Sequence, residues 1–124
     1  MLAWFKSHAA YGWATCSVTQ SAFIRVVLQP AFSGAVAAKI TVNDAAELLL
    51  RNTSHAQHCF VNLDFGFADV LATCTGGLHG HRQITDAYLL TAAIKNGMKL
   101  LSFDTGISSL LATQVERQTY ITTP

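Results

Sequence analysis

Residues 84–104 read Ile84-Thr-Asp-Ala-Tyr-Leu-Leu-Thr-Ala-Ala-Ile-Lys-Asn-Gly-Met-Lys-Leu-Leu-Ser-Phe-Asp104, and they contain the clearest structural unit of the chain. The apolar spacing predicts a helix over 84–96, with capping residues near its start at Thr85 and Asp86. Gly97 closes this helix, because glycine readily adopts the left-handed conformation that ends helices. The apolar run that follows predicts a strand over 99–103, which ends at Asp104. A helix followed at once by a strand indicates an α/β fold.

The rest of the chain repeats this alternation of helices and strands. The helices that we predict are the end of a helix over 1–10, two helices over 20–28 and 42–52, a helical turn over 68–73 and a short helix over 107–112. The further strands that we predict lie at 13–18, 59–63 and 119–122. Thr19 is the expected N-cap of the helix over 20–28, and Leu48, Leu49 and Leu50 are expected to bury the helix over 42–52. Such alternation predicts a mostly parallel sheet covered by helices on both faces.

Length and composition limit the class of protein. The chain has 124 residues, of which 51% are hydrophobic and 12% charged, enough for one core, so we predict a single domain over residues 1–124. A formal net charge of +1 provides no global field for nonspecific nucleic-acid binding. The three cysteines form no CxxC pair, which argues against a disulfide framework or a structural zinc site. Without an apolar run of about 18 residues, we expect a soluble, cytoplasmic protein with no membrane partner.

Three polar side chains are expected at one edge of the predicted sheet. In right-handed strand-helix-strand units, a helix starts near the carboxyl end of the preceding strand, and the next parallel strand ends at that same edge. Asp86 lies at a helix start and Asp104 at a strand end, with Gln20 at the start of an earlier helix. Mg²⁺ or Mn²⁺ prefers oxygen ligands and often takes only one or two protein carboxylates. The pattern therefore indicates a divalent cation bound by the two aspartates.

The residues alone leave structural alternatives open for both aspartates. Asp86 also fits an ordinary helix cap, which is a frequent use of aspartate at a helix N-terminus. Asp104 also fits the first position of a turn through Thr105 and Gly106.

Two blocks of sequence resemble a known family. The first is Gly80-His-Arg-Gln-Ile-Thr-Asp-Ala-Tyr-Leu-Leu90 with Leu100-Leu-Ser-Phe-Asp104, and the second is Trp13-Ala-Thr-Cys-Ser-Val-Thr-Gln-Ser-Ala-Phe-Ile-Arg25 with Gln29-Pro30. Their order and separation are similar to those of VapC-type PIN-domain toxins from toxin–antitoxin systems. The resemblance runs from about Trp13 to the end of the chain.

The resemblance implies a PIN-like three-layer α/β domain, with a mostly parallel central sheet flanked by helices. It implies an acidic pocket that binds Mg²⁺ or Mn²⁺ and cleaves RNA, with Asp86 and Asp104 as catalytic and metal-binding residues. Gln20 falls where many relatives have a glutamate, and its amide carries no charge to attract a cation. The remaining candidates to line the site are Thr19, Thr85 and Arg82. The Arg82 guanidinium suits a phosphate, and a solvated loop residue is the alternative. The implied partners are RNA, an antitoxin and a second copy of the chain.

The resemblance also carries one departure. Members of the family begin with a short strand that ends in an aspartate, so we expect this chain to lack the first strand and most of the first helix.

Three hypotheses for the function of the chain follow. The chain is a metal-dependent endoribonuclease toxin, a catalytically inactive PIN remnant that binds only an antitoxin or its own copy, or an unrelated α/β domain that binds a phosphate or small molecule.

Overall fold

The structure, a computed structural model, describes residues 2–30 and 39–124. The chain divides into two compact units, Lys6–Asn62 and a second that comprises Leu63–Pro124 with the start of helix α1 (Leu2–His8). Helix α1 continues as the 3-10 helix η1 (Ala9–Tyr11) and ends at Gly12, in agreement with the helix predicted over 1–10. The single PIN-like domain expected over residues 1–124 stays a prediction.

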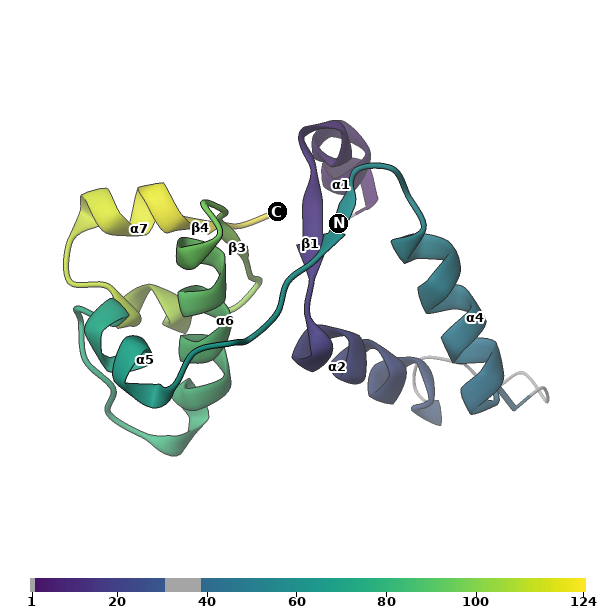
Figure 1. The fold of residues 1–124 in the computed structure, drawn as a ribbon, viewed down its shortest axis with the longest axis horizontal. Coiled ribbons are helices and arrows are strands. Elements are labelled where there is room, and N and C mark those ends of the chain that lie inside the picture. The colour runs from purple at the N-terminus through teal and green to yellow at the C-terminus, as the bar shows by residue number, and fades with distance from the viewer. Residues whose placement is uncertain (1, 31–38) are drawn as a thin grey trace. The chain divides into compact units, whose positions relative to one another are not determined.

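The described part of the first unit contains one parallel strand pair and two long helices. Strand β1 (Trp13–Thr15) pairs with β2 (His58–Phe60), and Ala14 is opposite Cys59 in the register. Helix α2 (Ser17–Val27) follows β1 directly and packs against α4 (Val42–Thr53), as Figure 1 shows. Both strands are shorter than the predicted ranges 13–18 and 59–63, but their positions and parallel direction agree with the prediction.

The start of α2 differs from the prediction. The N-cap is Cys16, whose extended backbone precedes the first helical residue, Ser17. Thr19 is the third residue of the helix, and its hydroxyl accepts a hydrogen bond from the Cys16 backbone N–H at 2.9 Å. This is the contact that the third helical residue makes in a capping box. The assignment of Thr19 as the N-cap was therefore wrong by one turn.

Helix α4 begins as predicted and is buried less than predicted. The Thr41 hydroxyl accepts from the Asp44 backbone N–H at 3.1 Å, and the Asp44 carboxylate accepts from the Thr41 N–H at 2.8 Å. Of the helix residues only Ala45 is fully buried, and Leu50 is 67% exposed. Successive residues of a helix are separated by about 100°, so three leucines in a row cannot all face one core.

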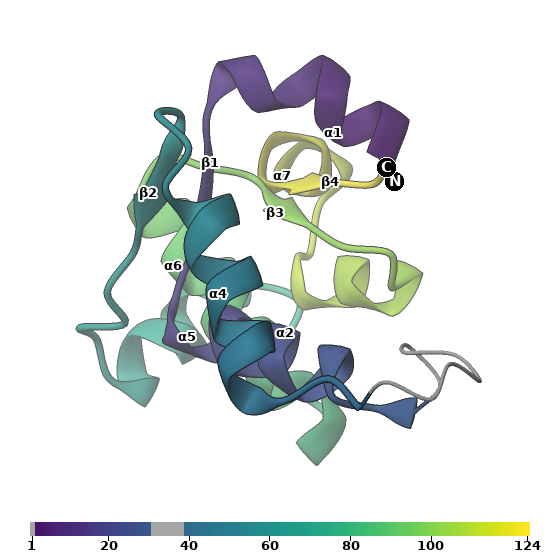
Figure 2. The same ribbon diagram turned by 90° about the vertical axis from the view of Figure 1, so that its right-hand side faces the viewer.

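The second unit is built around helix α6 (Ile84–Lys95), which follows the 3-10 helix η2 (His81–Gln83). Helix α5 (Phe67–Thr73) packs against it. After α6 come β3 (Leu100–Leu101), η3 (Thr105–Leu110), α7 (Gln114–Tyr120) and β4 (Ile121–Thr122). Strands β3 and β4 are parallel and lie side by side in Figure 2, with Leu100 opposite Ile121.

Several boundaries in the second unit depart from the predictions. The predicted helix over 107–112 is instead the 3-10 helix η3, which begins earlier, at Thr105. Helix α7 was not predicted, and it occupies the start of the range 119–122 that was assigned to a strand. Helix α6 ends one residue before its predicted end, and Gly97 beyond it has a φ of 65°. Within residues 2–30 and 39–124, the strands form two separate two-stranded parallel sheets.

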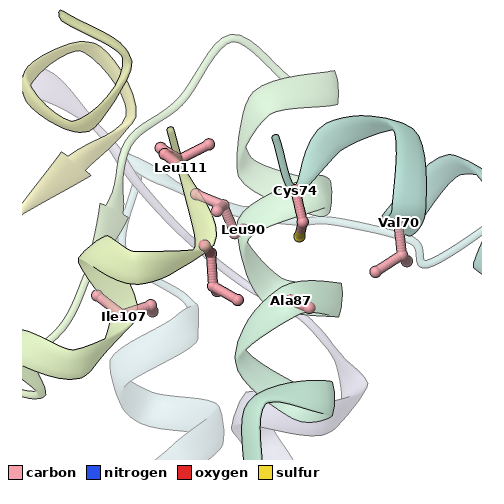
Figure 3. Close-up of a cluster of buried hydrophobic side chains, with 7 residues drawn as sticks. Val70, Cys74, Ala87, Leu90, Ile107 and Leu111 are labelled. Atoms are coloured by element: carbon pink, nitrogen blue, oxygen red, sulfur yellow. The ribbon is translucent and has the colours of Figure 1, made fainter. Parts of the chain in front are cut away.

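One apolar cluster organises the second unit (Figure 3). Leu90 of α6 is fully buried, and its side chain lies beside Leu111, which follows η3. The buried members of the cluster are Val70, Cys74, Ala87, Leu90, Ile107, Leu110 and Leu111. Full burial of a leucine side chain stabilises a fold by about 1.5–3 kcal/mol. The cluster therefore holds η3 against α6, and these two elements carry the candidate acids.

Candidate active site

Asp86 is the third residue of α6, in the first turn of the helix. The N-cap is Gln83, and the helix start has no side-chain capping hydrogen bond. The Asp86 carboxylate accepts no hydrogen bond from any residue within 2–30 and 39–124. Asp86 is thus not the helix cap that the alternative interpretation proposed. Its carboxylate is partly buried at a helix N-terminus, where the helix dipole favours negative charge.

Asp104 follows β3 and is the N-cap of η3. One carboxylate oxygen, Oδ1, accepts a hydrogen bond from the Gly106 backbone N–H at 2.8 Å. The Asp104 backbone N–H donates to the Ser102 hydroxyl at 3.0 Å. The turn through Thr105 and Gly106 is therefore present. The turn fixes the orientation of the Asp104 carboxylate through Oδ1. The other oxygen, Oδ2, accepts no hydrogen bond from the described part of the chain.

Asp86 and Asp104 line the same pocket, a cavity of about 290 Å³. Its other lining residues are Arg82, Gln83, Gly106, Ile107, Ser109 and Leu110. Ile107 and Leu110 belong to the buried cluster, so the wall of the pocket is attached to the core. The pocket lies entirely within the second unit.

Electrostatics link the two carboxyl groups. Partial burial raises the pKa of the Asp86 carboxyl, and the negative charge of Asp104 raises it further. Both causes act against the ionised form of Asp86. A divalent cation between the groups would remove this repulsion, because it attracts both carboxylates.

Arg82 is the predicted candidate that supplies positive charge to this pocket. It is exposed in η2, and its guanidinium makes no ion pair with the residues that the structure describes. Arginine stays charged at all ordinary pH values and presents a planar set of donors that fits phosphate oxygens. Thr85, exposed in the first turn of α6, is not one of the residues that line the pocket.

Two polar side chains of the pocket were not predicted, those of Gln83 and Ser109. The Gln83 Nε2 atom donates a hydrogen bond to the Ser109 hydroxyl at 3.2 Å. A signal for Gln83 existed, because it precedes Asp86 by three positions and such a pair lies on one side of a helical turn. Ser109 gave no comparable signal.

Thr19 and Gln20 lie on α2, in the first unit. The Gln20 side chain donates from Nε2 to the Thr15 hydroxyl at 2.9 Å, and that hydroxyl is 2.8 Å from His58 Nε2. The Thr19 hydroxyl is engaged with Cys16 at the start of the helix. The role of Thr19 and Gln20 in lining the acidic site stays a prediction.

The donors in the pocket fit a hard divalent cation. Asp86 and Asp104 offer carboxylate oxygens, which Mg²⁺ and Mn²⁺ prefer, and Mg²⁺ commonly keeps several waters beside one or two carboxylates. Within the described ranges, no group of three or more His, Cys, Asp or Glu side chains is placed to hold a metal ion. A closed structural zinc site needs four such ligands and does not fit this pocket.

Comparison with known proteins identifies the family. The chain is 34% identical over 106 residues to Ribonuclease VapC44 of Mycobacterium tuberculosis. The aligned residues are 86% of this chain and 72% of VapC44. The chain is 35% identical over 107 residues to Ribonuclease VapC38 of the same species, with the same coverage. The chain belongs to the VapC ribonuclease family. The resemblance seen in the two blocks of sequence is thereby confirmed.

A further VapC ribonuclease of that species, VapC39, is 27% identical over 110 residues. The chain spans 72% of the length of VapC44 and VapC38. No protein-family model matches the chain, and no solved structure matches it. An α/β fold with short parallel strand pairs is consistent with membership of the VapC family. Among the described helices, none has the length and apolar character needed to cross a lipid bilayer.

Proposed function

We propose that this chain is a metal-dependent endoribonuclease toxin of a toxin–antitoxin system. The observation that carries the proposal is the pocket shared by Asp86 and Asp104 in a member of the VapC ribonuclease family. The substrate is RNA, and the reaction is hydrolysis of a phosphodiester bond. The corresponding partner is an antitoxin, and a second copy of the chain is proposed as a homodimer partner. We also propose the three-layer PIN arrangement for the complete fold.

Asp86 and Asp104 are the residues proposed to hold Mg²⁺ or Mn²⁺. When bound, the ion supplies activation of water and stabilises negative charge on the phosphate. The hydrogen bond from the Gly106 N–H orients the Asp104 carboxylate before a cation binds. Asp86 must lose its proton before it can bind a cation, and its raised pKa places that step at a higher pH than for an exposed aspartate.

Arg82 is proposed to bind the phosphate of the RNA. Arg82 lines the same pocket as the two aspartates, and its guanidinium has no competing carboxylate partner among the described residues. A charge-assisted hydrogen bond to a phosphate oxygen would orient the substrate and offset its negative charge. Removing Arg82 should therefore weaken RNA binding, with Asp86 and Asp104 still present.

The test is cleavage of structured RNA in the presence of Mg²⁺. We expect cleavage by this chain and loss of cleavage in Asp86→Asn and in Asp104→Asn. Asp69→Asn is the matched control, because Asp69 pairs with Lys95 at 3.6 Å and does not line the pocket. Equal cleavage by all four proteins would reject the proposed roles of the two aspartates.

A second function is favoured by one observation, the small number of acids in the pocket. No cluster of three or more metal-binding side chains occurs within the described residues. On this view the chain is a catalytically inactive family member that binds only an antitoxin or its own copy. Calorimetry with Mn²⁺ separates the two functions, because a low-affinity site would support the inactive form. A dissociation constant at or below about 1 μM, equivalent to −8.2 kcal/mol, would argue for the nuclease.

A further inference from the structure

Gln83 connects two loops that border the acidic pocket. Its side-chain oxygen accepts hydrogen bonds from the backbone N–H groups of His79, at 2.6 Å, and Gly80, at 3.3 Å. Its side-chain nitrogen donates to the Ser109 hydroxyl at 3.2 Å. Both ends of one amide are therefore used, and they join the loop before α6 to η3.

The connection continues from Ser109 to Asp104. The Ser109 hydroxyl donates to the Gly106 carbonyl oxygen at 2.8 Å, and the Gly106 N–H donates to Asp104 Oδ1 at 2.8 Å. A continuous set of hydrogen bonds thus runs from Gln83, three positions before Asp86, to the carboxylate of Asp104. Within residues 39–124, the bond between Gln83 and Ser109 is the only side-chain hydrogen bond that joins η2 to η3.

Backbone packing supports the same junction. The Gly76 N–H donates to the Leu110 carbonyl oxygen at 2.9 Å. A Cβ atom at Gly76 would collide with the carbonyl oxygen of Ser109. The loop before α6 and the end of η3 are therefore in direct contact, and Gln83 and Ser109 bridge them beside the pocket.

We propose that Gln83 and Ser109 are positioning residues, whose mutual hydrogen bond sets the separation of the Asp86 and Asp104 carboxylates for a divalent cation. The inference rests on the proposed metal-dependent function. Neither residue is needed as a ligand in this role. Side chains that orient metal ligands typically change metal affinity by about 10–100-fold when they are removed. The bond between Gln83 and Ser109 fixes the distance between the start of α6 and η3. Asp86 lies in the first turn of α6, and Asp104 is the N-cap of η3.

The experiment measures Mn²⁺ binding by calorimetry to the metal-free chain, with thermal unfolding of each variant as the check of folding. Ser109→Ala removes the acceptor of the bond and should weaken Mn²⁺ binding by about tenfold. Ser109→Thr keeps a hydroxyl and should restore the affinity. Ser108→Ala is the matched control, because the Ser108 hydroxyl donates only within η3, to the Thr105 carbonyl oxygen at 2.9 Å. It should bind Mn²⁺ as the unchanged chain does.

A double-mutant cycle separates positioning from direct contact with the ion. If Gln83 and Ser109 act through their mutual bond, the double variant Gln83→Ala with Ser109→Ala should lose less Mn²⁺ affinity than the two single losses added together. Additive losses would overturn the proposal, as would unchanged affinity in folded Ser109→Ala or an equal loss in Ser108→Ala. If the unchanged chain binds no Mn²⁺, the metal site under the proposed function fails first and this inference fails with it.

Discussion

Asp86 and Asp104 line one pocket although 18 positions separate them in the chain. Partial burial and the negative charge of Asp104 together raise the pKa of the Asp86 carboxyl. Asp86 is thus coupled to Asp104, since the charge of Asp104 alters the proton affinity of Asp86. This coupling can be measured without any substrate.

Asp104→Asn should lower the pKa of Asp86. The substitution removes the neighbouring charge but leaves the burial of Asp86, so the pKa should fall and yet stay above that of an exposed aspartate. Titration of the side-chain carboxyl signals by NMR would measure the change. Asp69→Asn serves as the control because Asp69 faces Lys95 instead. An Asp86 pKa that does not respond to Asp104→Asn would show that the two carboxyl groups are uncoupled.

Asp86 should make stability fall as pH rises through a defined window. The unfolded pKa of an aspartate is about 3.9, and the folded pKa of Asp86 is higher, so between the two values the folded chain binds more protons. The free energy of unfolding then decreases with rising pH across that window. Asp86→Asn should remove this contribution. The free energy of unfolding of the variant minus that of the unchanged chain should therefore increase as the pH rises through the window to neutral pH.

Urea unfolding of both proteins at several pH values tests this. Asp44 and Glu116 act in the opposite direction, because hydrogen bonds from the backbone and hydroxyl groups of their capping partners lower their pKa values. Their contributions are the same in both proteins and cancel in the difference. A difference in stability that stays constant with pH would contradict the raised pKa of Asp86.

Local signals explain which parts of the fold could be predicted. The range of α6 was predicted within one residue at each end, because its apolar spacing and the closing Gly97 both act locally. The start of the helix predicted over 42–52 also agrees with α4, because the Thr41 and Asp44 capping box that begins it is local in the sequence. Helix α7 also has a capping box, since Thr113 and Glu116 exchange hydrogen bonds at 3.2 and 2.9 Å. That pattern was present in the sequence and would have revealed the helix.

Contacts between distant loops explain what could not be predicted. The meeting of Asp86 and Asp104 could be expected, because a helix start and a strand end meet at one edge of a parallel α/β unit. The bond between Gln83 and Ser109 joins residues 26 positions apart in two short 3-10 segments. Such segments have no apolar period that would place them, so the bond could not be predicted from the sequence. Of the two residues, only Gln83 had a local signal, its spacing of three positions from Asp86.

Gly76→Ala should destabilise the second unit. The added Cβ would collide with the Ser109 backbone carbonyl, which cannot move aside as a flexible side chain can. Overpacking of this kind typically costs about 1–3 kcal/mol. Gly80→Ala is the matched control in the same loop, because a Cβ there meets nothing within 4 Å and its φ of −168° suits any residue. Urea unfolding compares the two, and equal stability of both variants would refute the close contact.

Mn²⁺ should stabilise the folded chain through Asp86 and Asp104. A ligand that binds only the folded state raises the free energy of unfolding, by about 2.7 kcal/mol at a concentration of 100 times its dissociation constant. Thermal unfolding should therefore shift upward with Mn²⁺ in the unchanged chain and in Asp69→Asn. The double variant Asp86→Asn with Asp104→Asn should show no shift, because amides lack the charge that attracts the cation. An equal shift in the double variant would mean that Mn²⁺ binds elsewhere on the chain.

The thermal shift in the unchanged chain should also shrink as pH falls, since the raised pKa of Asp86 makes protons compete with the ion.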